Sequence, residues 1–365
     1  MTKSAAVPPH NSPGTPDKSH IPSVVRRAFE IDPQATPQGV GRPGFSGARV
    51  YRVTGGPSPW CLKALPLDQV DLLRQRGLQR LQQHLAAGGL SCIASPRFTQ
   101  GGAPWVVDAG WLWQCEPWLP GEADRSPCIS PQRLRAACQA LALWHERARR
   151  FVPKPAEAVW FRSHPAEPSP AARERAAQLR ETLATDLSEL RARAVAGLPH
   201  DLHPAVEVVV QDVRRRGREV ADVLEQLQTH PLPIQPCLRD VWREHVLFVG
   251  DQVTGIIDPQ AARCDSPAVD LARLLGSLCG CDRGAWNTGL GAYAEIRPLS
   301  VNEEGLIPPL DLSGCLLAGL HWIERLLRSR EIAEPLLTAA RERLWHFAGR
   351  LVGQPIGAEN SRPTW

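Results

Sequence analysis

The residues best suited to chemistry lie in one stretch, CLRDVWREHVLFVGDQVTGIIDP, which runs from Cys237 to Pro259. Asp240 and His245 stand five residues apart on a predicted loop. A strand, a turn and a second strand follow, and Asp258 stands at the end of the second strand. The pattern fits either an ordinary β-hairpin with polar ends or a centre for phosphoryl transfer. A plain surface hairpin would not need carboxylates at each of these places, so we favour the second interpretation.

The residues before this stretch predict a small region of mixed helix and strand. Alternating apolar residues and turn dipeptides mark the strands, and a Gly-Gly pair ends the helix. A lone lysine, Lys63, lies among apolar residues on the second strand. We predict strands at 47–54 and 60–66, a helix at 68–90, and two more strands within 104–119. Together they form an N-terminal lobe over residues 29–118.

Most of the remaining chain reads as helices. Ser130 is a strong N-cap, with proline at the first helical position. We predict helices at 130–150, 170–196, 204–229, 268–279, 284–295, 310–328 and 334–351. They form a C-terminal lobe over residues 119–352, with a helical insertion at about 170–229. Residues 1–28, rich in Pro, Ser and Gly, are predicted to be a disordered tail, and 353–365 a second tail.

The order of these elements resembles that of the protein-kinase-like phosphotransferases. Within them it is similar to the aminoglycoside phosphotransferase and homoserine kinase type family. The resemblance extends from about Val40 to Leu351. It implies a bilobal α+β fold with a small β-sheet lobe that carries one helix and a larger, mainly helical lobe.

Three matches in the N-terminal lobe imply an ATP site. GRPGFSGARVYRV at 41–53 resembles the loop that covers the phosphates, and CLKAL contains the lysine that binds the α- and β-phosphates. WLWQCEPWLPGE at 111–122 is similar to the hinge whose backbone binds adenine. Taken singly, a Gly-rich turn is often only a turn, and the lysine could be an edge residue that extends to water. The implied nucleotide-binding residues are Gly44, Ser46, Gly47, Lys63, Gln114, Cys115 and Glu116.

The opening stretch carries the fourth and most specific match. The family motif H-G-D-x-x-x-x-N, its hairpin and the later D-L-A appear here as LRDVWREH, a hairpin ending in IIDP, and SPAVDLA. On this match Asp240 is the catalytic base, and Asp258 holds Mg²⁺ against the phosphates. His245 stands at the second metal position, and Asp270 braces the catalytic loop.

Two departures from the family pattern affect the chemistry. The family asparagine at the second metal position is His245, and the residues before the base are Leu238 and Arg239 in place of His and Gly. Mg²⁺ prefers oxygen ligands, so the imidazole could tolerate Mn²⁺, hydrogen-bond a phosphate or a metal-bound water, or serve only in packing.

The second departure concerns the partner of the lysine. No glutamate occurs between Lys63 and Glu116, so the helix glutamate that pairs with this lysine in the family is absent. Gln75 or Gln79 could orient Lys63 through a hydrogen bond, but neither carries the charge.

Composition limits the classes of partner. The chain of 365 residues has a net charge of only +4 with scattered Lys and Arg, which argues against nucleic acid. Its ten cysteines include no C-x-x-C pair, and with no secretory signal they are expected to be reduced. No run approaches a membrane span, so we expect a cytoplasmic location and no membrane partner. The oligomeric state stays open.

These observations predict an ATP-dependent phosphotransferase that uses Mg²⁺, with Mn²⁺ as an option. It would transfer the γ-phosphate to a hydroxyl of a small molecule. The alternative is a catalytically weak or inactive kinase-like protein that binds a nucleotide or ligand, which Leu238, His245 and the missing glutamate would suit. Retention of both Asp240 and Asp258 favours the enzyme, since an inactive protein needs neither carboxylate.

Overall fold

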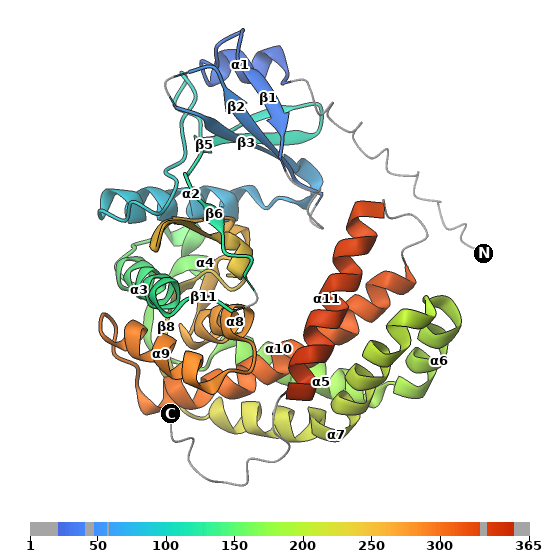
Figure 1. The fold of residues 1–365 in the computed structure, drawn as a ribbon. Coiled ribbons are helices and arrows are strands. Elements are labelled where there is room, and N and C mark those ends of the chain that lie inside the picture. Colours follow the sequence, from blue (N-terminus) through green and yellow to red (C-terminus); the bar gives the residue numbers. More distant parts are fainter. Residues whose placement is uncertain (1–20, 41–46, 57, 127, 329–333, 354–365) are drawn as a thin grey trace, which may run out of the picture. The chain divides into compact units, whose positions relative to one another are not determined.

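The computed structural model of the chain describes residues 21–40, 47–56, 58–126, 128–328 and 334–353 (Figure 1). Two compact parts can be distinguished by their internal contacts. The first lies within Met1–Leu72 and Ser95–Trp118, and the second within Leu73–Ala94 and Leu119–Trp365.

The first part is built on one antiparallel sheet of five strands in the order β1-β2-β3-β5-β4. Alternation along these strands buries Tyr51, Leu62 and Trp113 on the face that carries the core. Lys63 lies opposite Gln114 in the register of β3 and β5. The strands are β1 (Thr36–Gly39), β2 (Arg49–Thr54), β3 (Trp60–Pro66), β4 (Val106–Asp108) and β5 (Trp111–Pro117).

A short helix corrects the prediction that residues 1–28 are a disordered tail. Helix α1 (Ser23–Ala28) follows Ile21, and Ile21, Val25 and Phe29 are fully buried in the core of the first part. Three apolar residues spaced four residues apart therefore bury one side of this short helix. The Pro-rich composition of the whole segment hid this local pattern, while residues 1–20 lie outside the described residues.

The second part is mainly helical and carries two small sheets of three strands, ordered β10-β9-β6 and β11-β8-β7. The predicted class, a β-sheet region followed by a mainly helical region, is confirmed. The helices are α2 (Leu72–Ala87), α3 (Pro131–Ala148), α4 (Ala158–Phe161), α5 (Pro170–Ala184), α6 (Leu187–Gly197), α7 (His203–Leu227), α8 (Ala268–Cys279), α9 (Arg283–Ala294), α10 (Val301–Leu327) and α11 (Glu334–Gly353). The strands are β6 (Glu122–Ala123), β7 (His164–Glu167), β8 (Leu232–Cys237), β9 (Val246–Val249), β10 (Gln252–Ile256) and β11 (Arg263–Asp265).

Helix α2 packs with the second part, although we predicted it inside an N-terminal lobe over residues 29–118. Gly77 lies against the ring of Phe161, where an added Cβ would come within 2.8 Å of two ring carbons. On the same helix, Arg80 forms an ion pair with Glu157. The chain thus leaves the sheet after β3, contributes α2 to the helical part, and returns to the sheet at Ser95.

Two helix boundaries differ from their predictions for local reasons. The predicted helix at 170–196 is broken, because Asp186 accepts a hydrogen bond from the N–H of Ser188 at 2.8 Å and caps a new helix, α6. Helix α10 begins at Val301 and not at 310, with Ser300 and Glu303 forming a capping box. Pro308 and Pro309 lie inside it, so packing against neighbouring helices overrides the proline penalty.

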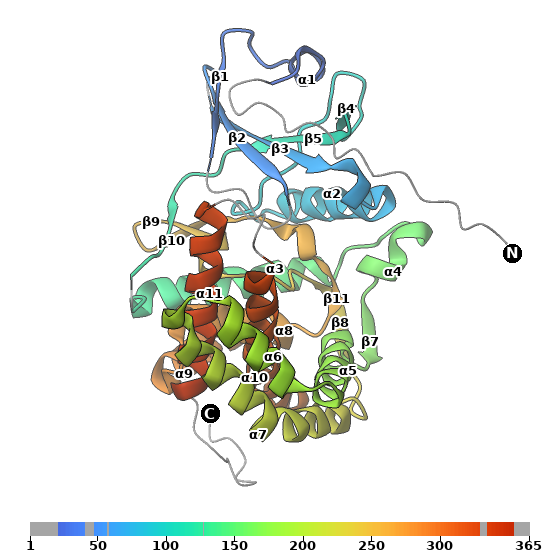
Figure 2. The same cartoon turned by 90° about the vertical axis from the view of Figure 1, so that its right-hand side faces the viewer.

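Helix α10 is also long and apolar enough to span a membrane, judged by length and composition within the described residues. The prediction that no run approaches a membrane span was therefore wrong by these criteria. Half of its apolar window is buried, and the helix contacts α5, α7, α8 and α11 (Figure 2). Its packing is that of a core helix in this part.

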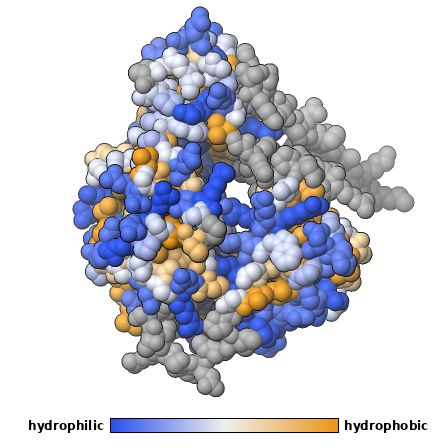
Figure 3. Space-filling model, in the orientation of Figure 1, coloured by the Kyte–Doolittle hydropathy of each residue, from blue (hydrophilic) through white to orange (hydrophobic). Residues whose placement is uncertain are grey.

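On the face drawn in Figure 3, hydrophilic residues predominate around small apolar patches.

Candidate active site

The loop after β8 is held by a buried carboxylate on α8. Strand β8 ends at Cys237, and Asp270 in the first turn of α8 is completely buried. Asp270 accepts hydrogen bonds from the backbone N–H of Leu238 at 2.7 Å and of Arg239 at 2.6 Å. Two charge-assisted hydrogen bonds to Asp270 thereby fix the backbone that leads to Asp240. This is the bracing geometry that the sequence implied for Asp270.

A histidine and a tyrosine complete this support. His145 on α3 places Nε2 3.0 Å from the Asp270 carboxylate and Nδ1 2.8 Å from the hydroxyl of Tyr293. Burial lowers the pKa of His145 and keeps the imidazole neutral. A neutral ring satisfies both partners if Nε2–H donates to Asp270 and the Tyr293 hydroxyl donates to Nδ1. These contacts could not be read from the sequence, because His145 lies 125 residues from Asp270 and 148 from Tyr293 along the chain.

Residues Leu238–His245, here called the catalytic loop, are also tied to α5. Arg239 stands where the family has glycine and has a φ of +62°, in the left-handed region. Its guanidinium pairs with Glu174 on α5 at 2.5 Å and with Asp265 at 3.4 Å. Asp265 in turn accepts hydrogen bonds from Ser169 and from the N–H of Ala171 at the start of α5.

Asp240 is half-exposed, with 44% of its side chain accessible. Its Oδ1 accepts a hydrogen bond from the indole N–H of Trp242 at 2.7 Å and forms an ion pair with Arg273 at 3.2 Å. Arg273 lies on α8 one turn after Asp270, on the same side of the helix. Sequence reasoning missed Arg273, although its spacing from Asp270 was the signal that could have found it.

His245 and Asp258 lie together at the open end of the β9–β10 hairpin. Val246 pairs with Ile256, and the carbonyl of His245 accepts a hydrogen bond from the N–H of Ile257 at 2.9 Å. The exposed Asp258 follows directly and has a φ of +59°. A left-handed φ is uncommon for residues other than glycine, although aspartate adopts it more readily than most. The structure thus brings Asp258, His245 and, through the catalytic loop, Asp240 to one region.

The donor atoms of His245 and Asp258 fit a divalent cation. Nδ1 of His245 lies 2.8 Å from the carbonyl oxygen of Asp240, so Nδ1 carries the hydrogen and Nε2 keeps its lone pair. Metal-binding histidines commonly donate their other ring N–H to a carbonyl in this way. The carboxylate of Asp258 is the ligand type that Mg²⁺ prefers, whereas the imidazole nitrogen is better suited to Mn²⁺.

A second group of metal-ligand types, His145, Cys237 and Asp270, is a structural cluster. Their ligand atoms lie within 4.8 Å of one another and all three residues are buried. Burial raises the pKa of the Cys237 thiol well above its usual value, so the sulfur keeps its hydrogen and donates to the carbonyl of Asp265. The oxygens of Asp270 are already hydrogen-bonded to the catalytic loop and to His145.

Lys63 in the first part has a carboxylate partner that the sequence prediction missed. Its Nζ lies 2.6 Å from Oε1 of Glu116, and both side chains are nearly buried, with 11% and 13% exposed. Glu116 stands two residues after Gln114 on β5, on the same face of the sheet. Lys63 therefore pairs with a glutamate on the neighbouring strand β5, whereas the family pattern has this glutamate on the helix after the lysine. Gln75 and Gln79, which the sequence analysis considered as partners of Lys63, are buried on α2 in the second part.

The backbone of Gln114, Cys115 and Glu116, which we predicted to bind adenine, takes part in the sheet. The carbonyl of Cys115 accepts a hydrogen bond from the N–H of Arg97 at 2.8 Å. Gln114 and Glu116 pair with β3 on the other side. The three residues lie inside the sheet, so their backbone does not form a free edge.

The predicted phosphate-covering loop is only partly described. Gly44 and Ser46 lie outside the described residues. Gly47 is exposed and has a φ of +73°, a conformation that glycine adopts without strain.

A sheet with a paired lysine and a helical part with Asp240 and His245 on a braced loop near Asp258 define a kinase-type phosphotransferase. The chain belongs to the phosphotransferase enzyme family, whose model matches residues 41–305. The predictions of this family, of a protein-kinase-like fold and of a small-molecule kinase are confirmed, with the acceptor unspecified. None of the comparisons favours the alternative of an inactive binding protein.

Similar proteins support the same assignment. A homoserine kinase from Methylocella silvestris is 29% identical over 286 residues, which cover 76% of each chain. Spectinomycin phosphotransferase in complex with ADP and spectinomycin has a TM-score of 0.63 at 13% identity, covering 90% of this chain and 95% of that one. Amicoumacin kinase in complex with AMP-PNP, Ca²⁺ and Ami has a TM-score of 0.60 at 14% identity, covering 88% and 91%. The two structural likenesses concern the fold alone.

Proposed function

We propose that this protein uses ATP and a divalent cation to phosphorylate the hydroxyl group of a small amino acid, with homoserine as the first candidate. The observation that carries the proposal is the position of Asp240 on a braced loop close to His245 and Asp258. The name of the relative that aligns over three quarters of its length supports the acceptor.

Asp240 is the base in this proposal. Its carboxylate accepts a hydrogen bond from the acceptor hydroxyl and takes the proton as the oxygen bonds to the γ-phosphorus of ATP. The bond from phosphorus to the bridging oxygen of the β-phosphate breaks, and ADP leaves. Asp270 and His145 act by positioning, because they fix the backbone that carries Asp240.

The phosphates are bound by charge. Asp258 and Nε2 of His245 would hold the divalent cation, which would supply positive charge against the phosphate oxygens. Lys63 on the first part is the residue that the family resemblance assigns to the α- and β-phosphates, and Glu116 orients its ammonium group. Mg²⁺ is the expected cation, and the imidazole of His245 makes Mn²⁺ an effective substitute.

The test measures ADP formation from ATP with L-homoserine in the presence of Mg²⁺ or Mn²⁺. We expect turnover in the wild type and a loss of at least about 100-fold in Asp240→Asn, since the amide cannot take the proton. Asp251→Asn is the matched control, because Asp251 is an exposed residue on the hairpin turn. ATP-dependent thermal stabilisation should persist in Asp240→Asn. Absence of turnover with homoserine and with a panel of other hydroxy compounds would overturn the proposal.

A further inference from the structure

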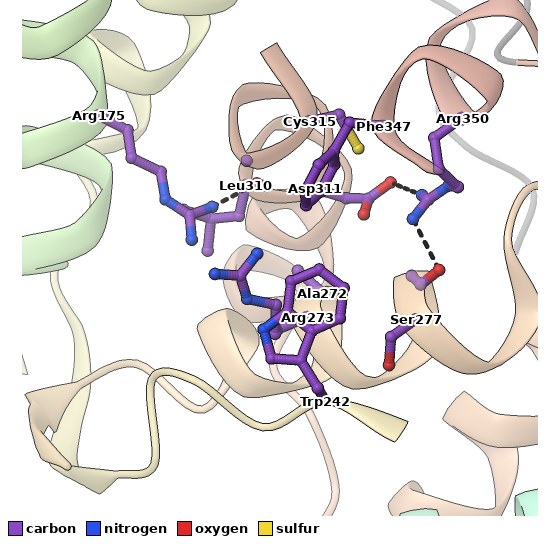
Figure 4. Close-up of a pocket in the computed structure, with 12 residues that line it drawn as sticks. Arg175, Trp242, Ala272, Arg273, Ser277, Leu310, Asp311, Cys315, Phe347 and Arg350 are labelled. Atoms are coloured by element: carbon purple, nitrogen blue, oxygen red, sulfur yellow. Dashed lines mark hydrogen bonds and ion pairs between the residues drawn. The ribbon is translucent and has the colours of Figure 1, made fainter. Parts of the chain in front are cut away.

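A small pocket on the second part lies beside Asp240. It is lined by residues of α5, α8, α10 and α11 together with Trp242 of the catalytic loop (Figure 4). Its volume is about 20 Å³, which is enough for about one water molecule. An acceptor can therefore reach Asp240 from this side only if a lining side chain moves.

Arg273 is the pocket-lining residue that contacts Asp240. Its guanidinium forms the ion pair with Asp240 and lies over the indole ring of Trp242, 4.4 Å from the ring centroid. Its Nε is buried and donates no hydrogen bond within the described part of the chain. Because an arginine has five N–H donors, Arg273 can donate hydrogen bonds to a carboxylate other than that of Asp240.

A second cation faces the same pocket. Arg175 on α5 donates a hydrogen bond to the carbonyl of Leu310, and Figure 4 shows its guanidinium directed toward the same space as that of Arg273. Burial, together with the positive charge of Arg273, lowers the pKa of Arg175 to about 10. Asp311 on the far side of the pocket is paired with Arg350 at 2.6 Å. The wall next to Asp240 is thus positively charged and suits an anionic group.

We propose that Arg273, with Arg175 beside it, binds the carboxylate of the acceptor and so determines the specificity of the enzyme for amino acids. This inference rests on the proposed function. The carboxylate of the acceptor replaces Asp240 as the partner of Arg273, and Asp240 becomes available to the acceptor hydroxyl. An acceptor without a carboxylate has to displace Arg273 and leaves a partly buried cation without a partner, so it is rejected.

The test compares L-homoserine with 3-aminopropan-1-ol, which has the same amine and hydroxyl but lacks the carboxylate. In the wild type we expect kcat/KM to favour homoserine by about 100-fold or more. In Arg273→Gln we expect kcat/KM for homoserine to fall by about 100-fold, while that for 3-aminopropan-1-ol stays the same or rises. Arg273→Lys, which keeps the charge and loses the fork geometry, should recover part of the preference.

Arg343→Gln is the matched control. Arg343 also contacts the Trp242 ring, at 4.3 Å, but pairs with Glu244 and does not line the pocket. We expect this variant to keep the preference for homoserine. An equal loss for both acceptors in Arg273→Gln would show a merely structural role and overturn the inference.

The wild type alone separates this inference from the proposed function. Equal turnover of both acceptors would leave the phosphotransferase in place and overturn the role of Arg273. No turnover with any hydroxy compound, despite ATP-dependent stabilisation, would overturn both. These comparisons in the wild type do not depend on whether the Arg273 variants fold.

Discussion

His245 donates its Nδ1–H to the backbone carbonyl oxygen of Asp240 across 2.8 Å. The residue at the second metal position therefore holds the backbone of the residue at the base position in place. The bond also leaves Nε2 of His245 as the only ring atom able to bind a cation.

The first prediction concerns metal preference. His245→Asn replaces a nitrogen ligand with an amide oxygen, and Mg²⁺ prefers oxygen. We expect the ratio of the Mg²⁺-supported to the Mn²⁺-supported kcat/KM to rise by about tenfold. His230→Asn, at an exposed position after α7, is the control and should leave the ratio unchanged. An unchanged ratio in His245→Asn would show that the imidazole does not bind the cation.

The second prediction concerns the lysine pair in the first part. Lys63→Met removes the cation, so we expect affinity for ATP to fall by at least about tenfold while affinity for adenosine is kept. Glu116→Gln should give a smaller loss, because Lys63 keeps its charge but loses its partner. Titration of both ligands by calorimetry measures the difference. Equal losses for ATP and adenosine would point to damage of the sheet and contradict the assigned role.

The third prediction concerns Asp270. Asp270→Ala leaves the buried N–H of Leu238, the partly buried N–H of Arg239 and the Nε2–H of His145 without an acceptor, at a cost of about 1–3 kcal/mol for each group. We expect the free energy of unfolding to fall by about 3–5 kcal/mol, measured by urea denaturation. Asp282→Ala removes an N-cap at the surface of α9 and sets the scale of an ordinary polar contact at about 1 kcal/mol. A loss for Asp270→Ala no larger than this would contradict the bracing role.

The fourth prediction concerns pH. Burial, helped by the charges of Arg350 and Arg343, lowers the pKa of His346 on α11 from 6.5 to about 4. Between these two values the unfolded chain binds a proton at this residue and the folded chain does not, so stability falls as the pH falls. We expect a decrease of about 3 kcal/mol in the free energy of unfolding from pH 6.5 to pH 4 at this site. Denaturation at several pH values should show that the free energy of unfolding depends less steeply on pH in His346→Leu than in the wild type. An unchanged slope would contradict the prediction.

Much of the fold follows from local signals. The strand at 60–66 and the helix at 268–279 have the predicted bounds, because alternation and helical spacing are set by residues close in the sequence. Asp240, His245 and Asp258 could be placed because a single hairpin connects them. Arg273 and Glu116 could not be assigned in the same way. Their contacts depend on how α8 packs on the catalytic loop and on the register of β3 with β5.

The tie between Arg239 and α5 has a consequence for engineering. A chimera that receives residues 170–227 from another phosphotransferase would lose Glu174, and Arg239 would keep a left-handed backbone with one of its two carboxylate partners gone. Grafting the helices together with glycine at position 239 would remove both the strain and the orphaned charge. The unit to be transferred between two phosphotransferases is therefore discontinuous in the sequence. It consists of the helices of residues 170–227 and residue 239 of the catalytic loop.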